Sequence, residues 1–116
     1  MTKELISEVL DLRVYTFNVM EDYLQYNHSY QNELYTDNDI NIYEFAFKCK
    51  RWAEKKGWNI DTIHQDGGTL GRWLKCEPIG PNDPYGDYVE FIEADEVELI
   101  FTVCEWIVAG AEGYYE

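Results

Sequence analysis

The stretch NIYEFAFKCKRWAEKKGWNIDTIH, residues 41–64, decides the fold because it predicts a helix followed directly by a strand. Asn41 is placed as the N-cap, and Glu44 completes a capping box. Gly57 is placed as the C-terminal stop, after which apolar and polar residues alternate as far as His64, as in a strand. The apolar residues of the helix recur at helical spacing and form one predicted core stripe: Ile42, Phe45, Ala46, Cys49, Trp52 and Ala53.

Residues that follow this stretch predict a hairpin, a long loop, a third strand and a closing helix. The turn signal at 66–68 leads into a return strand over 69–76, and residues 77–86 are a loop by their turn chemistry. Residues 87–92 predict another strand. Asp95 caps the closing helix, whose apolar stripe also includes Phe101 and Cys104. A strand is the competing interpretation there, because the segment is rich in β-branched residues.

The N-terminal third is less clearly patterned. Leu5, Ile6, Val9 and Leu10 indicate a first helix. Residues 13–34 fit either a continued helix or a strand pair, and their tyrosine density favours a two-stranded hairpin. The sequence therefore predicts a single α+β domain over 1–116. Its three helices would pack on a small, mostly antiparallel sheet, in the order α-β-β-α-β-β-β-α.

Charge is the feature that says most about function. The chain has 116 residues with a net charge of −14, and residues 76–116 hold eleven acids and no Lys or Arg. Such a field repels anions and attracts cationic surfaces. We therefore expect a protein partner with a basic surface, such as a nucleic-acid-binding effector or a nuclease, and no direct contact with nucleic acid or membrane.

The expected partner-binding residues lie in and after the long loop. Tyrosines beside carboxylates suit a binding surface, because tyrosine is a large anchor of low entropic cost and the carboxylates can pair with Arg or Lys. An ordinary long turn is the equally weighted alternative. The expected binding residues are Asp83, Tyr85, Asp87, Tyr88, Glu90, Glu93 and Glu96.

Catalytic, cofactor and metal sites are not predicted. The three cysteines and two histidines lack metal spacing, so the cysteines are expected to be reduced, mostly buried thiols. A His64–Cys76 nucleophile pair is a weaker alternative, as is a divalent-cation site formed by Glu93, Asp95, Glu96 and Glu98. With no signal peptide or membrane-length apolar run, we expect a cytoplasmic protein. The basic residues of the 42–56 helix could instead contact the acidic region of a second copy, which would give a homodimer.

Two segments carry a family resemblance. Residues 41–53 with 56–58 resemble the core of small uncharacterised phage and prophage proteins, and residues 94–101 with 104–107 are similar to their closing helix. The plan is reminiscent of phage sandwich domains, in which sheet and helices pack in layers. The resemblance implies a phage origin and counter-defence work, and it carries over no activity.

Four classes of function follow from these observations, of which one is an acidic structural or assembly protein. The first is a non-enzymatic inhibitor, of the anti-CRISPR or anti-restriction kind, whose carboxylates stand in for phosphates in a basic nucleic-acid channel. The second is an immunity protein or antitoxin that blocks a nuclease toxin with a basic active site. The third, a small enzyme or metal binder, is the least favoured.

Overall fold

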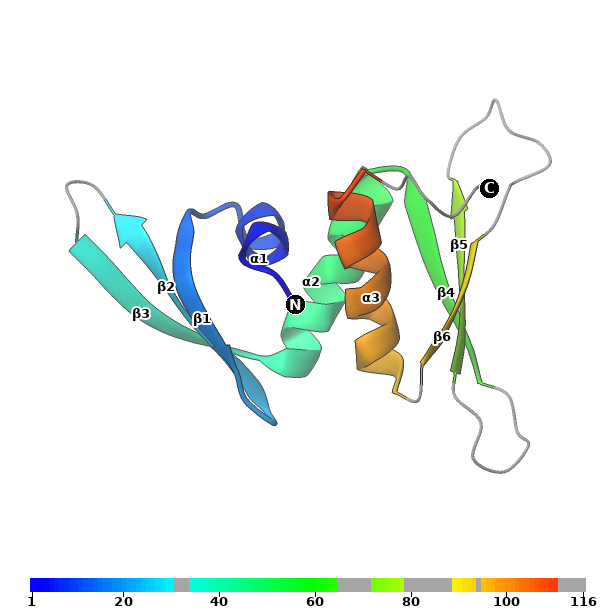
Figure 1. Ribbon diagram of the computed structural model, residues 1–116, viewed down its shortest axis with the longest axis horizontal. Helices are drawn as coiled ribbons and strands as arrows, with labels where there is room; N and C mark the ends of the chain where they lie inside the picture. Colours follow the sequence, from blue (N-terminus) through cyan, green and yellow to red (C-terminus); the bar gives the residue numbers. More distant parts are fainter. Residues whose placement is uncertain (31–33, 65–71, 79–88, 94, 111–116) are drawn as a thin grey trace. The chain divides into compact units, whose positions relative to one another are not determined.

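The protein is an α+β chain of three helices and six strands among the residues that its computed structural model describes, which are 1–30, 34–64, 72–78, 89–93 and 95–110 (Figure 1). The predicted α+β class is confirmed. Backbone contacts divide the chain into two compact units, Met1–Lys48 (unit 1) and Cys49–Glu116 (unit 2). The single domain over 1–116 stays a prediction. The predicted turn at 66–68 and most of the predicted 77–86 loop lie outside the described residues.

Unit 1 begins with α1 (Lys3–Leu10), which confirms the first predicted helix. Thr2 is its N-cap, and the Thr2 hydroxyl accepts a hydrogen bond from the Leu5 amide at 3.2 Å. The helix ends at Asp11, whose φ of 54° lies in the left-handed region. Leu5 and Ile6 are fully buried, and α1 lies against β1 on one face of the first sheet (Figure 1).

The first sheet has the order β1-β2-β3 and is antiparallel throughout. Its strands are β1 (Val14–Val19), β2 (Tyr23–Tyr30) and β3 (Leu34–Asn41). The strand interpretation of residues 13–34 is thereby confirmed. The third strand was not predicted, because its sequence LYTDNDIN is rich in Asp and Asn, which are depleted in strands. Backbone pairing with β2 over the whole length of β3 overrides that propensity.

The long helix α2 (Ile42–Lys55) matches the predicted helix closely. The Asn41 side-chain oxygen accepts hydrogen bonds from the amides of Tyr43 at 2.9 Å and Glu44 at 3.2 Å, which confirms the N-cap. Gly57 has a φ of 93°, the left-handed conformation that favours glycine at a helix end. All six residues of the predicted core stripe are buried: Ile42, Phe45, Ala46, Cys49, Trp52 and Ala53.

Unit 2 contains a second antiparallel sheet of order β4-β5-β6, with α3 against all three strands (Figure 1). The strands are β4 (Trp58–His64), β5 (Arg72–Pro78) and β6 (Val89–Glu93), and the helix is α3 (Glu96–Val108). Six residues of α3 are buried: Leu99, Ile100, Phe101, Val103, Cys104 and Trp106. The helix interpretation of this segment is confirmed, as is the predicted burial of Phe45, Cys49, Trp52, Phe101 and Cys104.

The arrangement of the strands differs from the prediction in two ways. The chain has one strand more than predicted, β3. Its strands form two three-stranded sheets, whereas one sheet was predicted. Local patterning identifies strands but not their partners, because sheet pairing depends on contacts between distant segments. Placing β3 beside β2 completes a sheet within unit 1, and the strands after α2 pair among themselves.

Candidate interaction surface

Four of the expected partner-binding residues, Asp83, Tyr85, Asp87 and Tyr88, lie outside the described residues. Two others are on β6. In the strand register Glu90 lies opposite Lys75, and Glu93 lies opposite Arg72. Two cations of β5 are therefore neighbours of these two acidic positions in the sheet. The expected partner-binding surface stays a prediction, and at β6 its acids lie beside cations that the distribution of charge along the sequence does not show.

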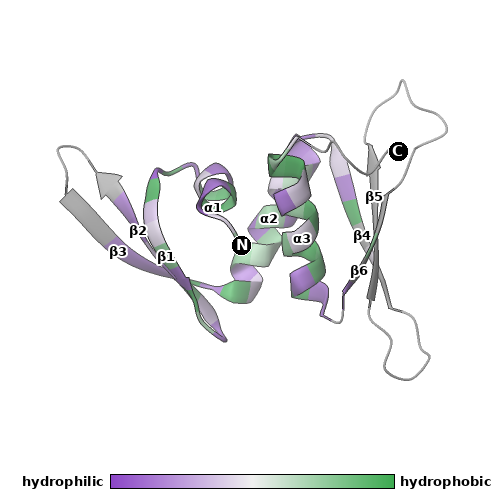
Figure 2. Ribbon diagram, viewed as in Figure 1, coloured by the Kyte–Doolittle hydropathy of each residue, from purple (hydrophilic) through white to green (hydrophobic). Residues whose placement is uncertain are grey.

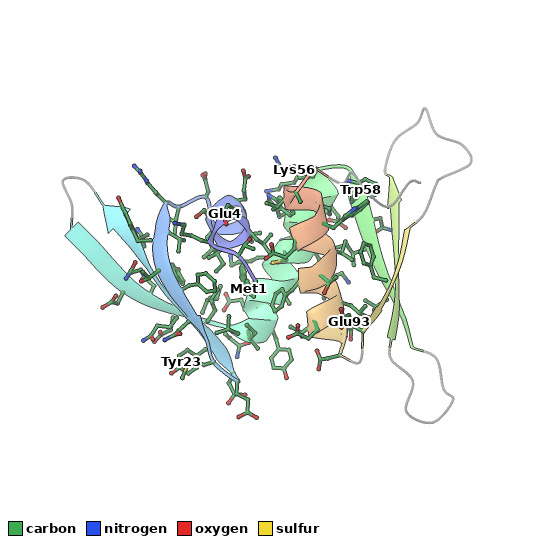
Figure 3. All side chains as sticks on the ribbon, viewed as in Figure 1. Met1, Glu4, Tyr23, Lys56, Trp58 and Glu93 are labelled. Carbon is green, nitrogen blue, oxygen red and sulfur yellow. The ribbon has the colours of Figure 1, made fainter. Side chains whose placement is uncertain are left out.

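The acidic residues around the start of α3 accept hydrogen bonds from other residues of unit 2. The Glu93 carboxylate accepts a hydrogen bond from the Thr102 hydroxyl at 3.2 Å, and Glu96 accepts one from the Thr62 hydroxyl at 2.8 Å. Asp95 caps the helix by accepting from the Val97 amide at 2.7 Å and the Glu98 amide at 3.3 Å. Figure 3 shows Glu93 between β6 and α3. These carboxylates join α3 to the sheet, and both Glu93 and Glu96 are only partly exposed.

Two of the three thiols are buried next to one another. The Cys104 thiol donates to the Cys49 carbonyl oxygen at 3.6 Å. A separate side-chain hydrogen bond with Cys104, together with burial, raises the pKa of the Cys49 thiol far above the ordinary range. A buried thiol that stays protonated is a poor nucleophile. Cys49 and Cys104 are therefore core residues, as expected.

The alternative His64–Cys76 pair is not brought together by the hairpin. His64 lies opposite Arg72, whereas Cys76 lies opposite Ile60. The two positions are offset along the ladder by four residues, which is about 13 Å at the rise of a strand. For metals, the described part of the chain contains no group of three or more His, Cys, Asp or Glu side chains placed to bind an ion.

The first sheet has one covered face and one open face. Directly opposed residues of an antiparallel pair share a face, and buried Leu24 has the partners Val19 and Ile40. The other face carries polar residues in register, and we call it the open sheet face. It consists of Thr16, Asn18, Tyr23, Gln25, Asn27, Asp37, Asp39 and Asn41, of which all except Asn27 are exposed. Figure 2 shows that β2 is mostly hydrophilic, whereas β1 carries hydrophobic residues among hydrophilic ones.

Large apolar side chains are exposed where this face meets α2. They are Met20, Tyr23, Tyr43 and Phe47, and we call them the aromatic end. Tyr43 is 65% exposed and Phe47 is 60% exposed. Figure 3 shows Tyr23 near the β1–β2 turn, on the side of the sheet away from α1. Sequence reasoning missed this surface, although Tyr43 and Phe47 lie one turn apart on α2 and outside the core stripe, which was an available signal.

A hollow of about 170 Å³ lies over the open sheet face. It is lined by Phe17 and Tyr26 together with five polar residues of the open sheet face: Thr16, Asn18, Gln25, Asn27 and Asp37. Asn27 fixes the irregular part of β1, because its side chain donates to the Thr16 hydroxyl at 2.7 Å and accepts from the Thr16 amide at 3.1 Å. The register of β1 and β2 shifts at this point, between Val14 and Thr16. The polar lining of the hollow is therefore held by a defined local structure.

No helix in the described ranges is long and apolar enough to cross a membrane. Comparisons of the chain with protein-family models, with curated proteins and with solved structures gave no match.

Proposed function

We propose that this chain is a non-enzymatic acidic binding protein that occupies a basic nucleic-acid-binding site on another protein. The more specific form of the proposal is a phage-encoded counter-defence inhibitor of the anti-CRISPR or anti-restriction kind, acting in the cytoplasm of the host. The observation that carries it is the charge: a net −14, with no Lys or Arg between Cys76 and Glu116. The expected contact residues remain Asp83, Tyr85, Asp87 and Tyr88 with the acids that follow them.

The physical basis is electrostatic substitution. A channel that binds nucleic acid presents Lys and Arg to phosphates, and a dense set of carboxylates can take the place of those phosphates. Opposite fields speed the encounter of two proteins, and salt slows it by screening. The same field disfavours direct binding to nucleic acid, because phosphates would be repelled.

Two features support binding rather than catalysis. The Cys49 and Cys104 thiols are buried, and the raised pKa of Cys49 keeps its thiol protonated, so Cys49 is unsuited to nucleophilic attack. The carboxylates of Glu93, Asp95 and Glu96 hold α3 by hydrogen bonds within unit 2. A binding role needs none of these groups to be reactive.

The test is a protection assay in bacteria that express the chain. One arm challenges cells that carry a CRISPR nuclease or a restriction enzyme with a targeted phage, and counts plaques. The other arm induces a nuclease toxin and counts surviving cells. We expect more plaques in the first arm. Protection in the second arm alone would identify the chain as an immunity protein or antitoxin, and protection in neither would overturn the proposal.

A charge-reversal variant tests whether protection depends on the acidic residues of the expected contact loop. The triple substitution Asp83→Lys, Asp87→Lys and Glu90→Lys reverses charge on and beside the expected contact loop. We expect it to abolish protection. Glu90→Lys places a second cation opposite Lys75 in the strand register, so the melting temperature should fall slightly, and the double variant Asp83→Lys with Asp87→Lys tests the loop without that change. Lys48→Glu with Lys55→Glu reverses two exposed cations of α2 and is the control, which should retain protection.

A further inference from the structure

We propose that the open sheet face and the aromatic end of unit 1 form a docking surface for a protein segment that carries an arginine and, about 13 Å away, an apolar side chain. The basic character of that segment rests on the proposed function. The location of the surface does not, because it follows from residues outside the acidic C-terminal third.

The first argument is the exposure of large apolar side chains in one place. Among the residues whose side-chain exposure the structure describes, which exclude most of β5 and β6, the exposed large hydrophobic side chains belong to unit 1, and four of them form the aromatic end. Tyr, Phe and Met are the residue types that are enriched in protein interfaces. Exposing them to water is unfavourable, and a cluster of this kind marks a binding site more often than a solvated face.

The second argument is that these residues are contiguous. The Ile42 amide donates to the Asp22 carbonyl oxygen at 3.0 Å, which holds the β1–β2 turn against the start of α2. Tyr23 is the register partner of Asn41, and the Asn41 side chain accepts from the Tyr43 amide at 2.9 Å. Phe47 follows Tyr43 by one helical turn. The aromatic end is thus one surface, continuous with the open sheet face through Tyr23 and Asn41.

The third argument is charge complementarity. Exposed carboxylates flank the apolar group on one side: Glu21 and Asp22 lie in the β1–β2 turn before Tyr23, and Glu44 follows Tyr43 on α2. Asp37 and Asp39 lie further along the open sheet face, on β3. Unit 1 as a whole contains nine acids and three bases, a net charge of −6. An apolar group beside carboxylates fits a partner whose apolar anchor is accompanied by cations.

The lining of the hollow on the open sheet face favours arginine as one of the partner's cations. This lining offers the Asp37 carboxylate and the side-chain amide oxygens of Asn18 and Gln25, and no Lys or Arg is among the lining residues. Arginine carries several N–H donors in a planar fork and no acceptor, so it matches an acceptor-rich hollow beside a carboxylate. Asn27 in the hollow and Tyr23 in the aromatic end are four residues apart on β2, which sets the separation of about 13 Å.

The experiment selects ligands without assuming a partner. A displayed library of random peptides of about 12 residues, which span up to about 40 Å when extended, is panned against the purified full chain. We expect the recovered peptides to combine Arg with aromatic or aliphatic residues. Recovery of no binding peptide, or of peptides without Arg or Lys, would overturn the proposal.

Variants then locate the binding. Tyr43→Ser with Phe47→Ser should weaken the selected peptides by about tenfold or more, and Asp37→Asn should weaken those with Arg but not their Arg→Gln versions. The matched control is Tyr15→Ser, because Tyr15 and Tyr23 are both 37% exposed and Tyr15 lies outside the surface. Equal binding by the Tyr43/Phe47 variant and the control would overturn the proposal.

Two further measurements distinguish this surface from the acidic loop of unit 2 and from an interface between two copies of the chain. The variant with Asp83→Lys, Asp87→Lys and Glu90→Lys should bind the selected peptides as tightly as the parent does. Peptide binding at unit 1 would therefore still be observed if the proposed function of the acidic loop proved wrong. Sedimentation of the full chain at increasing concentration tests whether two copies associate through this surface. We expect no dimer that depends on Tyr43 and Phe47, that is, none that is lost in the variant with Tyr43→Ser and Phe47→Ser. Such a dimer would make a second copy the occupant and would overturn the proposal.

Discussion

The Cys49 thiol shows how burial determines chemistry at the scale of one residue. Cys49 lies in the buried stripe of α2, and the thiol of Cys104 reaches its carbonyl oxygen. A side-chain hydrogen bond with Cys104 and, after it, burial favour the neutral thiol over the thiolate, so the pKa of Cys49 is raised. A group whose folded-state pKa is raised keeps its proton in the folded protein at a pH where the unfolded chain has lost it.

High pH should therefore destabilise the protein through Cys49. Above the ordinary thiol pKa of 9.0, the unfolded state releases a proton that the folded state retains, so the free energy of unfolding falls as pH rises. One such proton corresponds to about 1.4 kcal/mol per pH unit. Urea denaturation between about pH 9 and 10.5 measures this fall, and the Cys49→Ala variant should show a shallower one. Parallel pH profiles for the two proteins would contradict the assignment.

Trp52 provides a second test at this scale. It lies in the core stripe, and the Lys56 ammonium group is 6.0 Å from the centre of its ring. Trp52→Ala should reduce the free energy of unfolding by about 3–5 kcal/mol, because it leaves a cavity. Trp52→Phe is the matched control and should cost less, since it keeps an aromatic ring in the site. An unchanged denaturation midpoint for Trp52→Ala, followed by circular dichroism, would show that Trp52 is not part of the core.

At the scale of elements, side-chain caps determine where the helices begin. Thr2, Asn41 and Asp95 each accept a backbone N–H in the first turn of their helix. These amides have no partner inside the helix, so the side-chain oxygen satisfies them. Asp95 also places a negative charge at the positive end of the α3 dipole.

Removing the cap of α3 should destabilise the protein measurably. Asp95→Ala leaves the Val97 and Glu98 amides without their acceptor and should cost about 1 kcal/mol, within a range of about 0.5–2. Asp95→Asn keeps an acceptor oxygen and should cost less. Glu98→Gln changes the charge of the same turn without touching the cap, and it serves as the control. Chemical denaturation of the three variants compares them, and equal stability of Asp95→Ala and the parent would contradict the capping role.

The elements that the sequence predicts well are those whose signals are local. For α2 the cap, the stripe and the stop agree, and for β4 the alternation is clear from Trp58 to His64. The strand β3 was missed because its polar sequence fits a loop, and its partner β2 supplies the reason that it is a strand. Local patterning also cannot choose between one sheet and two, since that choice depends on which distant strands pair.

The candidate site was less predictable for the same physical reason. Tyr43 and Phe47 can be placed on the outer face of α2 from their spacing alone. Their association with Met20 and Tyr23 depends on the register of β2 with β3 and on the turn that precedes β2. Charge, in contrast, can be counted along the chain, but the register of β6 places Glu90 and Glu93 opposite cations that are distant in sequence.

For the whole molecule, the strength of the electrostatic field should be visible in the kinetics of binding. If the chain engages a basic channel, raising salt from about 0.05 to 0.5 M shortens the screening length from roughly 14 to 4 Å. Association should slow as a result, while dissociation changes less. Surface plasmon resonance against a target nuclease from the protection assay measures both rates. An association rate that does not change with salt would show that the acidity serves solubility instead.

The division between residues 48 and 49 also separates the chromophores of the protein. All four tryptophans lie in unit 2, and unit 1 contains six of the ten tyrosines but no tryptophan. Tryptophan fluorescence therefore follows the unfolding of unit 2, and the exchange of backbone amides in β1–β3, read by mass spectrometry, follows that of unit 1. A single domain requires the two transitions to coincide at every denaturant concentration. Transitions with separate midpoints would mean that the chain unfolds in two steps.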